Sequence, residues 1–90
     1  MEIINYIEIG KRIKESRLAK ELTQQKIAEE LGVSDEYVSK IETGKAKISL
    51  TRLAQLSILL DTPIEKLITG VVSKSTDYKI SEVTKVFEEL

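Results

Sequence analysis

Residues 24–41 read QQKIAEELGVSDEYVSKI, and the spacing of small and apolar residues in this stretch decides the fold. Apolar residues recur at helical spacing on both sides of Gly32, which predicts two short helices joined by a tight turn. Gly32 can take a positive φ after a helix, and this conformation costs most other residues roughly 1 kcal/mol or more. Ala28 must be small, because the second helix crosses the first there. The side chains expected to close the corner are Ile27, Leu31, Val33, Val38 and Ile41.

Such a corner is typical of a helix-turn-helix, in which the second helix, here 35–42, is shaped to enter the major groove of DNA. Helical spacing continues along almost the whole chain, so we predict an all-α fold. Thr23, Ser34 and Ser49 are good N-cap residues for three of the expected helices. Five helices are expected, over about residues 8–20 (with an earlier start left open), 24–30, 35–42, 49–60 and 63–70.

The flanking helices are expected to complete the core. The sharpest local signal is the start of the fifth helix, with Thr62 as its N-cap, Pro63 as its first residue and Glu65 as the acid of a capping box. Each flanking helix should bury one apolar face. The residues expected to face inward are Ile9, Ile13, Leu18, Leu50, Leu53, Leu56, Leu60, Ile64, Leu67 and Ile68.

The composition argues against several classes of protein. The chain of 90 residues is long enough for one domain. It has neither cysteine nor histidine, so we expect no disulfide and no metal site. It contains no run of about 18 apolar residues and no signal-peptide pattern, which favours a cytoplasmic protein without a membrane span. It also lacks a glycine-rich phosphate loop, and its carboxylates are scattered over helix surfaces, so we expect no enzyme, no cofactor and no small-molecule ligand.

The net charge of −1 says little about nucleic-acid binding, because phosphate attraction is local and falls off over about 8–10 Å. The most positive window containing loop sequence spans residues 40–52. Its basic residues are Lys40, Lys45, Lys47 and Arg52, and Glu42 is its one acidic residue. This window favours a contact with phosphate, and the alternative is an ordinary solvated loop.

Longer motifs around the corner match a known family. They are Ile9-Gly10-Lys11-Arg12-Ile13-Lys14 with Arg17, Leu22-Thr23-Gln24, Ile27-Ala28, Leu31-Gly32-Val33-Ser34, Tyr37-Val38-Ser39-Lys40-Ile41-Glu42 with Gly44, and Leu53, Leu56 and Leu67. Over about residues 8–70 the chain resembles the lambda-repressor and Cro-like (XRE) family of DNA-binding domains. The resemblance implies a five-helix domain over residues 1–70 that binds double-stranded DNA sequence-specifically through helix 35–42. It also implies a transcriptional regulator, which we expect to be a repressor.

The resemblance assigns DNA contacts residue by residue. Gln24 matches a glutamine that meets a DNA phosphate at a helix start. The residues expected to face base edges or adjacent phosphates are Asp35, Glu36, Tyr37 and Lys40, with Ser39 at the edge of that face. The residues expected in a loop that holds backbone phosphate are Thr43, Lys45 and Lys47.

Other matched positions belong to the scaffold. Arg17 and Glu42 are expected to form a structural ion pair that fixes the angle of the recognition helix. Glu21 stands where similar proteins often have glycine, so we expect either a strained backbone or a different turn there.

Several expected contacts have structural alternatives. Asp35 and Glu36 replace the neutral or basic residues usual at these positions. We expect Asp35 to favour the helix dipole, and we leave Glu36 open between accepting from cytosine N4 and facing solvent. Lys40 is the expected base contact, or it pairs with Glu36. Tyr37 could cover the apolar corner instead, and Gln24 could be solvated.

Residues 71–90 lie outside the match. Residues 71–79 are polar and read as a linker, after which Ser81 could cap a last short helix. Such a helix is marginal in water alone, so its apolar stripe must fold back on its own domain or pair with a second copy. We favour a homodimer that binds an inverted repeat. The stripe consists of Ile80, Val83, Val86, Phe87 and Leu90.

The alternative function is a protein-interaction module of the same fold, such as an antitoxin or an antagonist of another regulator. Asp35, Glu36 and the acidic balance favour this alternative. Gln24 and the basic window 40–52 favour DNA binding instead.

Overall fold

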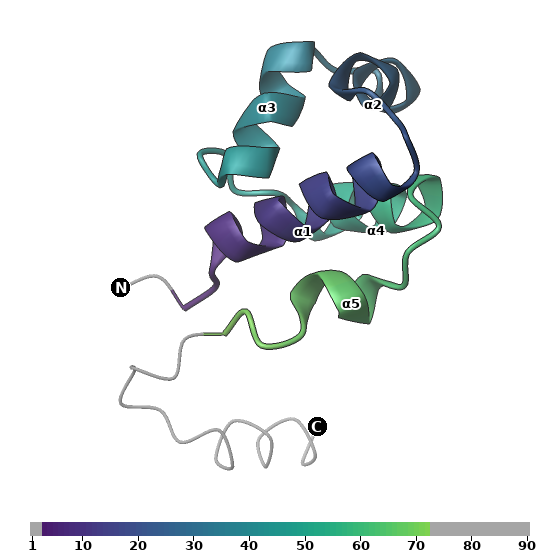
Figure 1. The fold of residues 1–90 in the computed structure, drawn as a ribbon. Helices are drawn as coiled ribbons and strands as arrows, with labels where there is room; N and C mark the ends of the chain where they lie inside the picture. Colours follow the sequence, from purple (N-terminus) through teal and green to yellow (C-terminus); the bar gives the residue numbers. More distant parts are fainter. Residues whose placement is uncertain (1–2, 73–90) are drawn as a thin grey trace.

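A computed structural model describes residues 3–72, and these residues form a bundle of helices (Figure 1). The helices are α1 (Tyr6–Ala19), α2 (Gln24–Leu31), α3 (Asp35–Thr43), α4 (Leu50–Leu59) and α5 (Ile64–Ile68). The predicted all-α class and the five expected helices are confirmed. None of the helices within residues 3–72 is long and apolar enough to cross a membrane.

Side-chain caps begin most of the helices at the expected places. The side chains of Thr23, Ser34 and Ser49 accept hydrogen bonds from the first-turn backbone of α2, α3 and α4, as predicted. Asn5 does the same for α1 by accepting from the Glu8 backbone N–H at 3.0 Å, so the first helix begins earlier than residue 8.

The expected start of the fifth helix is wrong by one residue. Pro63 occupies the N-cap position of α5 and makes no side-chain cap. The Thr62 hydroxyl lies 2.5 Å from the Ser16 hydroxyl of α1 and donates to the Leu60 carbonyl at 3.0 Å. Because this hydroxyl is used to join two neighbouring segments, it is not available to cap α5.

The predicted corner between α2 and α3 is present. Ala28 is 2% exposed, and Gly32 ends α2 with a φ of 70°. A second close approach, at Gly10, was not predicted: α1 packs so tightly on the end of α3 that a Cβ at Gly10 would lie 2.6 Å from the Glu42 carbonyl oxygen, and closer still to that of Ile41. Two small residues therefore set how α3 sits on the domain.

Three of the predicted core residues are exposed. Leu18 is 55% exposed, because the buried row of α1 runs through Ile9, Ile13 and Arg17 at a spacing of four residues and leaves Leu18 on another face. Leu50 is 73% exposed at the first position of α4, and Ile68 is 37% exposed at the last position of α5. Both lie at helix ends, where the neighbouring elements no longer cover them.

The two ends of the described chain pair with each other. Val71 is 4% exposed, and its carbonyl accepts from the Asn5 backbone N–H at 2.7 Å. Ile4 and Val72 form an isolated antiparallel bridge. Val71 and Val72, which were expected to start the linker, are therefore part of the packed domain. The predicted helix after Ser81 lies outside the described residues.

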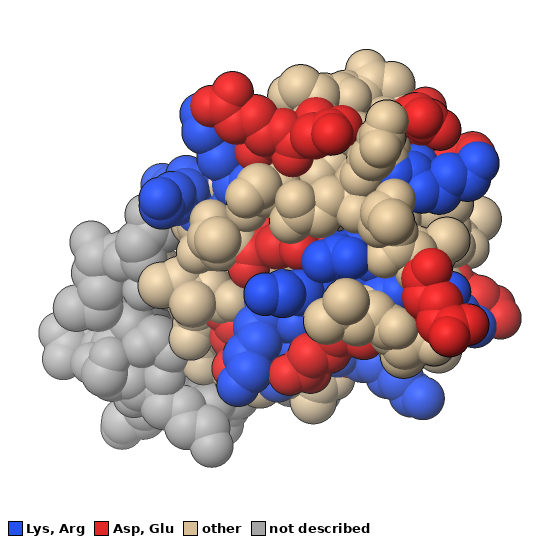
Figure 2. Space-filling model, turned by 45° about the horizontal axis from the view of Figure 1, so that its top comes forward, with Lys and Arg blue, Asp and Glu red and all other residues tan. Residues whose placement is uncertain are grey.

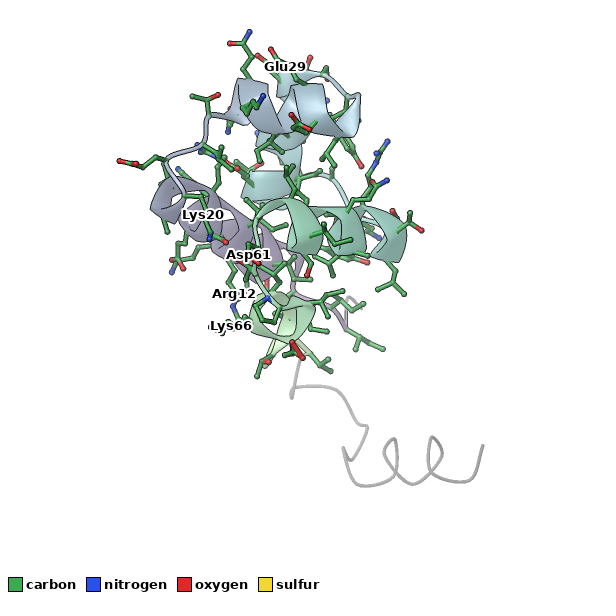
Figure 3. All side chains as sticks on the ribbon, turned by 90° about the vertical axis from the view of Figure 1, so that its right-hand side faces the viewer. Arg12, Lys20, Glu29, Asp61 and Lys66 are labelled. Carbon is green, nitrogen blue, oxygen red and sulfur yellow. The ribbon has the colours of Figure 1, made fainter. Side chains whose placement is uncertain are left out.

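Polar contacts fasten α1 to the C-terminal third of the fold (Figure 3). The Arg12 guanidinium donates to the carbonyls of Thr69 at 2.5 Å and Lys66 at 3.4 Å, at the end of α5. Lys20 lies 3.7 Å from the Asp61 carboxylate, and both side chains are largely exposed. Arg12 donates hydrogen bonds to carbonyls that have no partner within the helix, so it holds α5 on the domain.

Substitutions at two glycines measure separately the free-energy cost of a positive φ and that of a steric clash. At Gly32 nothing lies within 4 Å of an added Cβ, so Gly32→Ala should cost only about 1 kcal/mol for the positive φ. Gly10→Ala drives a methyl group into the α3 backbone and should cost about 3 kcal/mol. Urea denaturation measures both values, and equal losses would contradict the close approach.

Glu21 offers a stabilising substitution. Its φ of +58° lies in the left-handed region, so the expected strain at this departure from glycine is present. Glu21→Gly should raise the free energy of unfolding by roughly 0.5–1 kcal/mol, because relief of strain outweighs the added unfolded-state entropy. Glu21→Ala keeps the strain while removing the charge and is the matched control. The idea fails if the two variants have the same urea midpoint.

Candidate nucleic-acid interface

The recognition helix α3 divides cleanly into an inner and an outer face. Val38, Ile41 and Glu42 are buried. The expected contact residues point elsewhere: Asp35, Glu36, Lys40 and Thr43 are exposed, and Tyr37 and Ser39 are half-buried. The structure thus brings the predicted readout residues together on one side of α3.

The inner face of α3 ends in a buried ion pair with α1. Arg17 Nε donates to Glu42 Oε2 at 2.7 Å, and Arg17 Nη2 donates to Glu42 Oε1 at 3.1 Å. Arg17 Nη1 donates to the Leu22 carbonyl at 2.8 Å, in the turn before α2. Arg17 and Glu42 are 7% and 6% exposed, so water does not compete with this bidentate pair. The expected structural ion pair is present, and it also fixes the turn.

Gln24 joins the same network from α2. Its Nε2 donates to Glu42 Oε1 at 3.0 Å, and the residue is half-buried. Gln24 is therefore not a fully solvated side chain, which was its structural alternative. The Glu42 carboxylate accepts from the amide nitrogen and so fixes which end of the amide faces inward. One amide N–H and the amide oxygen remain at the first turn of α2, beside backbone N–H groups that have no intrahelical acceptor. This arrangement is suited to a phosphate oxygen.

Within the basic window, Arg52 and Lys40 make polar contacts with other residues of the domain. Arg52 donates to the Leu31 carbonyl at 3.2 Å and to Gln55 Oε1 at 3.0 Å, so it closes the end of α2. Lys40 lies 3.3 Å from the Glu36 carboxylate, as its structural alternative predicted. Lys45 and Lys47 are exposed in the loop after α3. Two of the four basic residues expected over residues 40–52 therefore lie exposed in this loop.

Two other expected contact residues already make contacts within the domain. The Thr43 hydroxyl donates within α3, to the carbonyls of Ser39 at 3.1 Å and Lys40 at 3.3 Å, so it cannot donate to a phosphate in this rotamer. The half-buried Tyr37 ring packs against the hydrophobic core, which fits its alternative role as a cover for the corner.

Figure 2 turns the α2 and α3 side of the molecule forward, and acidic and basic side chains are interleaved across the view. Asp35 and Glu36 contribute acidic charge at the first turn of α3. Any duplex bound here would meet alternating charges, so steering by charge must be short-ranged.

The sequence model of the helix-turn-helix family matches residues 13–67 of this chain. The chain belongs to this family. The match places the domain in the XRE type, and it covers the corner, the ion pair and the lysine loop described above.

Curated relatives are about one third identical to this helix-turn-helix chain over the aligned regions. The SPbeta prophage-derived regulator YonR of Bacillus subtilis (strain 168) is 36% identical over 61 residues, which are 68% of this chain and 56% of YonR. The regulator RC0668 of Rickettsia conorii is 36% identical over 72 residues, which are 78% of this chain and 58% of that protein. Both are described as uncharacterized HTH-type transcriptional regulators. The chain spans about half the length of the curated relatives it matches.

Solved structures give the same fold. The restriction-modification controller protein C.AhdI from Aeromonas hydrophila is 32% identical with a TM-score of 0.65, over 70% of this chain and 96% of C.AhdI. The clp gene regulator ClgR from C. glutamicum is 26% identical with a TM-score of 0.67, over 73% of this chain and 86% of ClgR. The lambda-repressor-like architecture expected for this helix-turn-helix chain is confirmed.

The buried ion pair makes a prediction about stability. Arg17→Met leaves the Glu42 carboxylate buried without its partner and should lower the free energy of unfolding by about 3–5 kcal/mol. The matched control is Lys26→Met, because Lys26 lies 3.2 Å from Glu30 in a half-exposed pair and should change stability by less than about 1 kcal/mol. Similar losses in the two variants, measured by urea denaturation, would show that the network does not support the fold.

Proposed function

We propose that this chain is a DNA-binding transcriptional regulator that inserts α3 into the major groove. The observation that carries the proposal is the rigid seat of α3: its inner face is fixed by Glu42 while its outer face presents short and long polar side chains. A helix held at one angle by a buried network can carry side chains to base edges with a defined register. The HTH-type regulators among its relatives support the same function.

The proposed contacts fall into two groups. Gln24 and the first turn of α2 bind one phosphate, while Lys45 and Lys47 bind the backbone on the other side of the groove. Between them, Lys40 leaves its pair with Glu36 and donates to guanine O6 and N7. Because that ion pair is exposed, the exchange costs little. Tyr37 and Ser39 lie at the edge of the same face, and Asp35 supports the helix dipole.

We further infer that the regulator acts in the cytoplasm as a repressor and binds an inverted repeat as a homodimer. A two-fold dimer places two copies of α3 in successive major grooves about 34–36 Å apart. A repressor of this kind needs no more than occupancy of its operator. Dimeric binding also doubles the phosphate contacts of a domain whose net charge is slightly negative.

One observation favours the rival function of a protein-interaction module. Asp35 and Glu36 are both exposed at the start of α3, where a duplex would bring phosphates close. A structure of the SinR protein/SinI protein complex is similar to this chain, with 27% identity and a TM-score of 0.63 over 89% of this chain and 78% of that chain. An acidic surface of this kind would suit a basic partner protein.

A salt series distinguishes the two functions. We expect the full chain to bind a random duplex with an affinity that falls steeply with salt, at a slope near −0.9 per phosphate contact, because counterions are released. Lys45→Ala should make the slope shallower by about one, whereas Lys66→Ala, a matched change on α5, should leave it unchanged. Fluorescence anisotropy measures both. No measurable binding at low salt would overturn the DNA-binding function and favour the interaction module.

A further inference from the structure

Two oppositely charged side chains, Glu36 and Lys40, lie at the centre of the outer face of α3. Val38 is 1% exposed and marks the inner face of this helix. Glu36 and Lys40 are each two residues from Val38, so both lie about 160° around the helix from it, at about 100° per residue. Their side chains are 78% and 52% exposed. This charged pair therefore points most directly away from the domain.

The other polar residues of the first two turns of α3 lie on its flanks. Asp35 is three residues before Val38 and lies about 60° around the helix from it. Tyr37 and Ser39 lie about 100° from Val38, on opposite sides of the helix. A base pair that faces the middle of α3 therefore meets the charged pair before it meets these side chains.

The charged pair has a defined spacing and polarity. Lys40 Nζ lies 3.3 Å from Glu36 Oε1, across one helical turn. The ammonium group is a donor of hydrogen bonds, and the carboxylate is an acceptor. Their exposed ion pair is cheap to open, but a carboxylate in the groove without a donor is unfavourable beside phosphates. When Lys40 turns to guanine, Glu36 therefore needs a new donor close by.

One G·C base pair presents the complementary pattern in the major groove. Cytosine N4 is a donor and guanine O6 is an acceptor. These two atoms are hydrogen-bonded to each other, so they lie about 2.9 Å apart. Guanine N7 is a second acceptor beside O6. The 3.3 Å between the ammonium and the carboxylate is close to the spacing of the base atoms, and the polarity is opposite.

We propose that Glu36 and Lys40 together read a single G·C pair. Lys40 donates to guanine O6 and N7, while Glu36 accepts from N4 of the paired cytosine. This inference rests on the proposed function and names the base pair that the domain prefers. It gives the Glu36 carboxylate a partner in the complex, whereas a solvated carboxylate at this position would only repel phosphates.

The other base pairs match the charged pair less well. T·A presents an acceptor and a donor in the same order, at thymine O4 and adenine N6. It also places the thymine methyl group near Lys40 and the adenine N7 acceptor near Glu36, which are both unfavourable. C·G and A·T reverse the order, so that the carboxylate meets an acceptor and the ammonium meets a donor. The expected preference is G·C, then T·A, then C·G and A·T.

Selection from a library of randomised duplexes by the full chain tests this preference. We expect the selected duplexes to share a G·C pair whose replacement by C·G weakens binding about 5- to 150-fold, measured by fluorescence anisotropy at fixed salt. Glu36→Ala and Lys40→Met should each lower this discrimination several-fold, and at the same position. Both side chains are exposed, so these variants keep the fold.

Glu30→Ala is the matched control. Glu30 forms an exposed pair with Lys26 on α2 at the same helical spacing and at 3.2 Å, so this variant removes the same charge without changing the outer face of α3. It should leave the discrimination unchanged. A duplex with 7-deazaguanine at the selected position lacks the N7 acceptor. It should bind several-fold more weakly than the unmodified duplex to the original chain, and equally well to Lys40→Met.

Two results would overturn the reading of one G·C pair. A Glu36→Ala variant that binds every duplex more tightly by the same factor would show that the carboxylate only repels phosphate. Loss of discrimination at different positions in Glu36→Ala and Lys40→Met would show that the two residues do not share a base pair. Absence of salt-dependent binding to a random duplex contradicts the proposed function itself, and this inference with it. Salt-dependent binding without the G·C preference contradicts this inference alone.

Discussion

One buried carboxylate holds three helices together. Glu42 lies on α3 and accepts hydrogen bonds from Arg17 of α1 and Gln24 of α2, so that a single side chain links the two helices of the helix-turn-helix to α1. The arginine also binds the Leu22 carbonyl, which brings the intervening turn into the network. A buried charge is stable only when its partners are all in place, so these elements form one cooperative unit.

The Glu42 network joins residues that stabilise the fold to a residue that is expected to contact DNA. Gln24 is both a ligand of the buried carboxylate and the side chain expected at a phosphate. Its conformation is set before DNA arrives, and part of the entropy of binding is therefore lost during folding. A substitution of Gln24 would therefore change the expected phosphate contact and the buried network together.

Most of the fold could be predicted from the sequence, because small residues, caps and apolar spacing act locally. The corner at Ala28 and Gly32 is an example. The tight contact at Gly10 could not be predicted in the same way, since it depends on a backbone that is 31 residues away in sequence. The contacts of Arg52 and Thr43 within the domain could not be predicted for a related reason: their side chains bind carbonyls whose positions only the folded chain defines. Exposure of Leu50 and Ile68 likewise follows from where neighbouring helices end.

The bridge between Ile4 and Val72 means that the chain enters and leaves the domain at one place. Any segment attached at either end must begin at this place, on the side of α1 that is remote from the outer face of α3. The helix-turn-helix domain can thus be attached to, or inserted into, other polypeptides as a unit with a single point of attachment. Relatives about twice as long as the matched region are compatible with this geometry, because additional sequence need not cross the outer face of α3.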